Sequence, residues 1–137
     1  MNKETIVIDD GAKVIEFTNN EGEVFAEFSF NPADPTIATR YDNMINFLKN
    51  YNYDNEQDSI EFIKKFNEDV ANAFNELFKK DVATGLFRTY APMSIMGNGD
   101  FFAEILIGHI GQIIEKELNV KLKEKQAKIK KATAKYK

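Results

Sequence analysis

The chain offers few side chains of the kinds that perform catalysis or bind metals. It contains no Cys and a single His, at position 109. Disulfides, thiolate metal ligands and Cys nucleophiles are therefore excluded, and a lone His cannot complete a usual zinc site. His109 lies between Gly108 and Ile110 in an apolar stretch. We therefore expect a buried or half-buried side chain that hydrogen-bonds to a backbone group.

The acidic and Gly-rich clusters also favour structural roles. Gly97–Asn98–Gly99–Asp100 resembles a phosphate loop only in its glycines, and the Asp would repel an anion at the helix start. Asp9–Asp10 and Asp54–Asn55–Glu56 lack the alternating ligands of a calcium loop, so we interpret both as solvated turns. Glu104 has no evident carboxylate partner for acid–base chemistry, and its place favours an interaction with the helix dipole. We predict a non-enzymatic chain with no catalytic residue, no cofactor and no metal site.

Length and composition predict one domain with an aromatic core. The chain has 137 residues, which fits a single domain spanning 1–137. Phe occurs 12 times and Trp is absent, so Phe must fill much of the core and can also form sticky surface. No apolar run approaches the length of a membrane span. Residues 1–4 lack the apolar stretch of a secretory signal. We therefore expect a cytoplasmic protein.

Charge is distributed unevenly between the body and the C-terminal end. Residues 121–137 contain eight Lys and one Glu, a net charge of +7, whereas the whole chain carries −4. The rest of the chain is therefore acidic, at −11. The basic segment has no Arg, and Tyr136 is its one aromatic residue, so base readout and stacking are poorly supported. We expect no nucleic-acid partner, and instead self-association into oligomers through head-to-tail contact of basic ends with acidic bodies.

Residues 1–30 show a β pattern. Thr5–Ile8 is short and β-branched, and Lys13–Phe17 resumes the extended pattern after a turn with Gly11. Residues 24–30 then alternate between apolar and other side chains with a period of two. The sequence predicts a three-stranded β-meander that must pack on helices to be stable.

Residues 35–120 show a helical pattern. Asp34 can cap a helix that has Pro35 at its first position. A second helix is predicted to begin at 58–59, and residues 86–99 are predicted to be irregular. A third helix is predicted to begin at Asp100, to become basic after Leu118 and to fray near Lys131. The three apolar stripes are Ile37, Tyr41, Met44, Leu48 and Tyr51; Ile60, Ile63, Phe66, Val70, Phe74 and Leu77; and Phe102, Ile105, Leu106, His109, Ile110, Ile113, Ile114 and Leu118.

Together these patterns predict an α+β fold, with a β-meander (1–30), a helical body (35–120) and a Lys-rich C-terminal tail (121–137). Gly108 and Gly111 interrupt the third stripe at a cost in helix stability. Their presence predicts that a neighbouring backbone packs closely there, within one chain or between subunits.

One block of sequence resembles a known family. The residues Phe28-Ser29-Phe30-Asn31-Pro32-Ala33-Asp34-Pro35, followed by Ile37, Arg40 and a helix through Leu48, are similar to the opening motif of tail assembly chaperones from siphophages of Gram-positive bacteria. The later layout is also similar, with Pro92 in a loop, Phe101–Phe102 opening a long apolar helix and a Lys-rich end. The resemblance implies a protein that acts in the host bacterial cytoplasm, binds the phage tape measure protein and keeps it soluble during tail assembly. It implies no catalytic or cofactor residue.

Candidate contact residues are the large apolar side chains that the core does not require. They are Phe87, Tyr90, Phe101, Phe102, Ile105 and Ile113, although a core position is the default expectation for each. An alternative function is a small phage-encoded inhibitor of a host protein such as a nuclease or defence factor. An inhibitor would form a discrete stoichiometric complex, whereas a chaperone would form a ladder of oligomers on its client.

Overall fold

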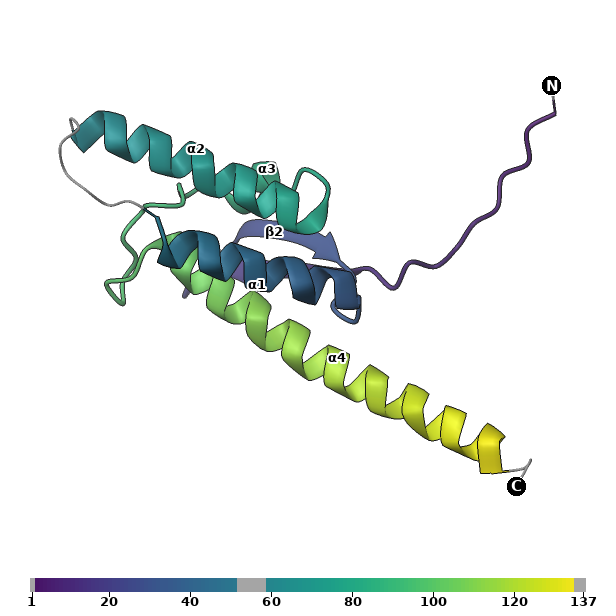
Figure 1. Ribbon diagram of the computed structural model, residues 1–137. Helices are drawn as coiled ribbons and strands as arrows, with labels where there is room; N and C mark the ends of the chain where they lie inside the picture. The colour runs from purple at the N-terminus through teal and green to yellow at the C-terminus, as the bar shows by residue number, and fades with distance from the viewer. Residues whose placement is uncertain (1, 52–58, 135–137) are drawn as a thin grey trace.

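The computed structural model describes residues 2–51 and 59–134 and has a mixed α+β fold. The elements in order are β1 (Lys13–Thr18), β2 (Val24–Phe30), α1 (Pro35–Lys49), α2 (Ser59–Phe78), α3 (Ala83–Leu86) and α4 (Phe102–Ala134). Helices α1 and α2 lie beside each other above the start of α4, and the far half of α4 extends well beyond the body (Figure 1). The α+β class predicted from the sequence is confirmed.

The described part of the chain has two strands in its sheet, so the predicted three-stranded meander is wrong. Strands β1 and β2 pair antiparallel, with Ile15 opposite Phe28. The segment Thr5–Ile8 is extended but pairs with no strand, and Val7 is 92% exposed. The carboxylates of Asp9 and Asp10 accept hydrogen bonds from the N–H groups two residues later, which confirms the solvated turn predicted there. This turn directs residues 2–8 away from β1 (Figure 1).

Helix α1 begins where its local sequence predicts. The Asp34 carboxylate accepts a hydrogen bond from the Thr36 N–H at 2.9 Å, and Pro35 occupies the first helical position. The predicted stripe from Ile37 to Tyr51 is buried or half-buried along its length. Arg40 Nε donates to the Leu77 carbonyl at 2.7 Å, which fastens α1 to the end of α2.

Helix α2 buries the later part of its predicted stripe but not the beginning. Phe66, Val70, Phe74 and Leu77 are buried, whereas Ile60, in the first turn of α2, is 61% exposed. Asn75 then orders the chain after the helix, because its Oδ1 accepts the N–H groups of Val82 and Ala83. The short helix α3 that follows was not predicted. The predicted turn at 54–56 lies outside the described residues.

Phe is the most frequent residue type in the core, in line with the composition. Phe28 and Phe30 stack at 5.1 Å between ring centroids, and Phe78 from α2 packs against both. The set of largest fully buried side chains is Phe30, Phe66, Phe74, Phe102, Leu86, Leu106, Ile110, Val70 and Pro32. The sheet, α2 and the start of α4 therefore share one hydrophobic cluster.

Helix α4 corrects three expectations. It begins at Phe102. The Phe101 N–H donates to the Glu104 carboxylate at 3.1 Å, so Glu104, and not Asp100, satisfies this donor at the helix start. His109 is exposed, because it lies about 100° around the helix from the buried Ile110 and faces away from the body. The helix also continues through Ala134 instead of fraying near Lys131, so it crosses the predicted boundary between body and tail without a break.

Candidate protein-binding surface

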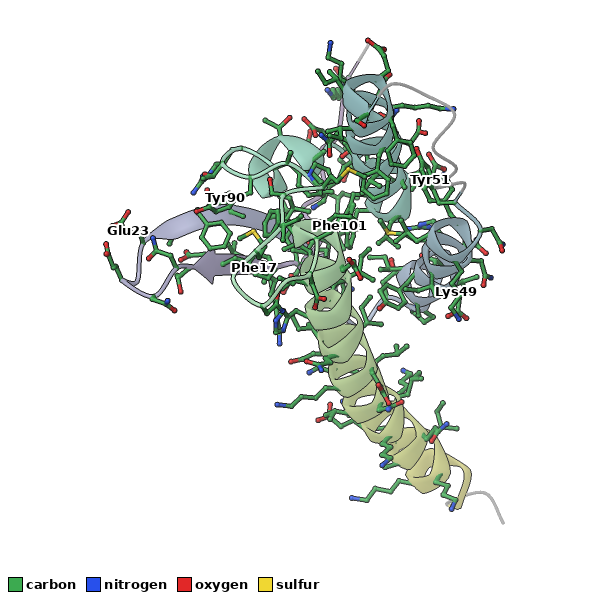
Figure 2. All side chains as sticks on the ribbon, turned by 90° about the vertical axis from the view of Figure 1, so that its left-hand side faces the viewer. Phe17, Glu23, Lys49, Tyr51, Tyr90 and Phe101 are labelled. Atoms are coloured by element: carbon green, nitrogen blue, oxygen red, sulfur yellow. The ribbon has the colours of Figure 1, made fainter. Side chains whose placement is uncertain are left out.

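The six predicted contact residues do not form one surface. Phe102 is only 2% exposed, so its assignment as a contact residue is wrong. Phe87 and Tyr90 are half-buried and direct their rings at it, with centroid distances of 5.9 Å and 5.8 Å. These two residues therefore order the loop before α4 by packing on the core. Figure 2 shows Tyr90 beside the sheet, at a distance from Phe101.

The other three predicted residues are spread along the first turns of α4 and do not gather at one place. Ile105 and Ile113 are half-buried, and Ile113 packs against the edge of the core. Phe101 is half-buried at the start of α4, with its ring 5.8 Å from that of Phe66. Phe101 also lines an open groove.

This groove runs between α1 and the first turns of α4 and has a volume of about 420 Å³. We call it the α1–α4 groove. Its rim carries one charge of each sign, Lys49 and Glu104, and most of its other lining atoms are apolar. The lining residues are Tyr41, Ile45, Leu48, Lys49, Phe66, Phe101, Ala103, Glu104, Ile107 and Gly108. Figure 2 shows Phe101 at the head of α4 and Lys49 at the end of α1, on the two sides of this region.

The two glycines of α4 near α1 have different surroundings. A Cβ on Gly111 would lie 2.7 Å from Cζ of Tyr41 and closer still to its hydroxyl, so Gly111 is where the two helices meet. The Tyr41 hydroxyl donates to the Ile107 carbonyl at 2.9 Å. A Cβ on Gly108 would meet nothing within 4 Å. The predicted close approach of a neighbouring backbone is therefore wrong for both glycines: the Tyr41 side chain makes the contact at Gly111, and Gly108 leaves the groove open.

The contact at Tyr41 has an electrostatic consequence. Burial raises the pKa of the Tyr41 hydroxyl above its usual value of 10.0, and the neighbouring Asp42 carboxylate raises this pKa further. Tyr41 therefore stays protonated through the physiological range and remains a hydrogen-bond donor to α4.

A second groove lies between α1 and α2 and is larger, at about 640 Å³. Four charged side chains line it, those of Arg40, Asp69, Glu76 and Lys79, and Arg40 is already engaged with the α2 carbonyl. The Glu76 and Lys79 side chains also pair with each other. Binding of an apolar partner here would remove these charged side chains from water, which costs free energy. We therefore favour the smaller α1–α4 groove as a binding surface.

Beyond α1, the face of α4 that forms the groove continues as exposed surface. Ile107, Gly111, Leu118, Leu122 and Ile129 follow one another at spacings of four and seven residues, which places them along one side of a helix. Leu122 is 42% exposed and Ile129 is 55% exposed. We call Leu118, Leu122 and Ile129 the α4 strip. Residues 119–134 extend about 24 Å past Leu118, and every side chain from 119 to 131 is exposed.

The chemistry-bearing side chains of the described part of the chain do not gather in clusters that could hold a metal ion. Within residues 2–51 and 59–134, no cluster of three His, Cys, Asp or Glu side chains is placed to hold a metal ion. None of the helices in this described part is long and apolar enough to cross a membrane. No protein-family model matches the chain, and no curated protein or solved structure matches it either.

Sequence reasoning missed most of this surface. The sequence predicts that Tyr41 and Leu48 belong to the apolar stripe of α1. A stripe alone does not show which of its side chains line a groove, because the groove also depends on the neighbouring helix. The four- and seven-residue spacing that links Ile107 to Leu122 and Ile129 was a readable signal. The Lys-rich composition after Leu118 concealed it.

Proposed function

We propose that this protein is a phage tail assembly chaperone, which binds helical segments of the tape measure protein in the host bacterial cytoplasm and keeps them soluble. The observation that carries the proposal is the row of apolar side chains along one side of α4, which lines the α1–α4 groove at Ile107 and continues, more widely spaced and with Lys125 between its last two members, as the α4 strip. An amphipathic client helix can lay its apolar side along such a face. The resemblance around Asn31–Pro35 supplies the client's identity.

The charges on the projecting part of α4 suit a client with acidic as well as apolar side chains. Residues 121–131 contain six Lys and one Glu. A basic helix with an apolar strip attracts an acidic amphipathic helix over the distance that salt leaves unscreened, about 8 Å at physiological ionic strength. Many copies along one long client would then add through effective concentration, without a single tight site.

Co-expression with the tape measure protein of the same phage tests this function. We expect the client to be soluble with the parent chain and insoluble without it. Gly108→Leu should fill the α1–α4 groove and reduce the soluble client, because the new side chain points into open space and leaves the fold intact. Gly97→Leu is the matched control, since a Cβ at Gly97 also meets nothing within 4 Å and lies away from the groove.

A second pair of variants tests the α4 strip. Leu122→Asp should weaken client binding, whereas Val120→Asp should have little effect. Both residues are similarly exposed, at 42% and 47%, but Val120 lies on another side of the helix. Equal solubility of the client with and without this protein would refute the chaperone function. A tight one-to-one complex with a host enzyme in place of the client would support the inhibitor.

A further inference from the structure

Residues Thr5–Ile8, which we call the N-terminal arm, have the composition of a strand but no strand partner. Ile6, Val7 and Ile8 are 73%, 92% and 79% exposed, although β-branched side chains favour half-buried, pleated surfaces. The arm leaves the sheet at Gly11, whose φ is +73°, and runs away from the body (Figure 1). Three exposed apolar side chains in a row are costly in water, so the arm has a strong tendency to pair.

The sheet has one open edge that can receive a strand. Strand β1 pairs with β2 on one side, and no backbone hydrogen bond joins its other side to any part of the chain that the structure describes. The far edge of β2 is covered instead. Arg88 donates to the carbonyls of Val24 and Phe25, and Thr89 donates to Phe25. Gly85 also approaches the Glu27 carbonyl too closely for a side chain.

The side-chain pattern of the arm matches the open edge. In the register of a hairpin with the four-residue loop Asp9–Ala12, Ile6 would lie opposite Ile15 and Val7 opposite Val14. Ile15 is opposite Phe28 in the sheet, on the face that includes the buried Phe30. Ile6 and Ile8 would therefore extend the buried face of the sheet, while Val7 would join the 66% exposed Val14 on the other face.

We propose that the N-terminal arm of one copy adds to the β1 edge of a second copy, and that the reciprocal exchange forms a dimer. The structure has the geometry of an open hinge, because the Asx turns at Asp9 and Asp10 hold the arm away from its own β1. The exchanged arm pairs with β1 of the second copy in the way that it would pair with its own β1 in a closed hairpin. Such an exchange is a low-cost route to a two-fold dimer. This dimer does not depend on the proposed client.

Lysine substitutions on the two faces of the arm test the exchange. We expect concentration-dependent dimers of the parent chain in sedimentation experiments. Ile6→Lys should raise the dimer dissociation constant about tenfold or more, because it places a charge on the buried face. Val7→Lys should change it much less. Since both side chains are exposed in the monomer, neither change affects its fold. Equal effects at both positions, or a parent chain that is monomeric throughout, would overturn the proposal.

Crosslinking between single-Cys variants distinguishes exchange from a closed hairpin, and the chain has no native Cys to interfere. A mixture of Val7→Cys and Val14→Cys should form a mixed disulfide dimer under mild oxidation. The mixture of Val7→Cys with Val120→Cys is the control for random collision of exposed thiols. If the mixture of Val7→Cys with Val14→Cys gives no more mixed disulfide dimer than the mixture of Val7→Cys with Val120→Cys, exchange is refuted. A Val7→Cys/Val14→Cys double variant that closes within one chain, as a monomer, would likewise refute it.

Discussion

Replacing Gly108 and Gly111 separately by Ala should have opposite effects on stability. Both residues lie inside α4, where Ala is favoured over Gly by about 0.5–1 kcal/mol. At Gly108 the new methyl group meets nothing within 4 Å, so this gain should appear in full. At Gly111 the methyl group overlaps the Tyr41 ring, and overpacking of this kind costs about 1–3 kcal/mol.

The cost at Gly111 has a defined structural origin. The Tyr41 ring must move away from α4, which breaks the 2.9 Å hydrogen bond from its hydroxyl to the Ile107 carbonyl. That bond contributes about 0.5–1.5 kcal/mol. The overpacking cost and the lost hydrogen bond together exceed the helix gain, so we expect Gly111→Ala to be less stable than the parent chain by at least about 0.5 kcal/mol.

Urea unfolding at 25 °C, followed by circular dichroism, measures both variants on one scale. The midpoints should separate on either side of the parent midpoint while the slopes stay equal. In a Tyr41→Ala background the clash is absent, so Gly111→Ala should there stabilise as Gly108→Ala does. If Gly111→Ala stabilises the parent chain as much as Gly108→Ala, then α1 does not pack on α4 at this point, and the α1–α4 groove loses its geometric basis.

Two further predictions concern α1. Asp34→Ala removes the acceptor for the Thr36 N–H and should cost about 0.5–2 kcal/mol of stability; an unchanged urea midpoint would show that the cap is dispensable. The raised pKa of Tyr41 predicts that stability falls at alkaline pH. The unfolded chain releases this proton near pH 10 and the folded chain holds it to higher pH, so the contribution is present below pH 10 and is lost as pH rises through the folded pKa. In Tyr41→Phe the loss of stability above pH 10 should be shallower.

The sequence by itself determined the features that depend on neighbouring residues. Asp34 and Pro35 fix the start of α1 through contacts within one turn, so local sequence was sufficient to predict it. The stripe from Phe66 to Leu77 in α2 is buried as its spacing predicts, because a helix of fixed period has one apolar side to cover. The abundance of Phe likewise predicted an aromatic core.

The tertiary structure decided the features that depend on residues far apart in the chain. Thr5–Ile8 has the composition of a strand, but a strand requires a paired edge, and the turn at Asp9–Gly11 directs this segment away from the available one. Phe101 and Phe102 are adjacent and identical in type, yet Phe101, just before α4, lines a groove, whereas Phe102, the first residue of α4, is buried. The groove itself depends on the contact between Tyr41 and Gly111. These residues are 70 positions apart in the sequence, and only the folded chain brings them together.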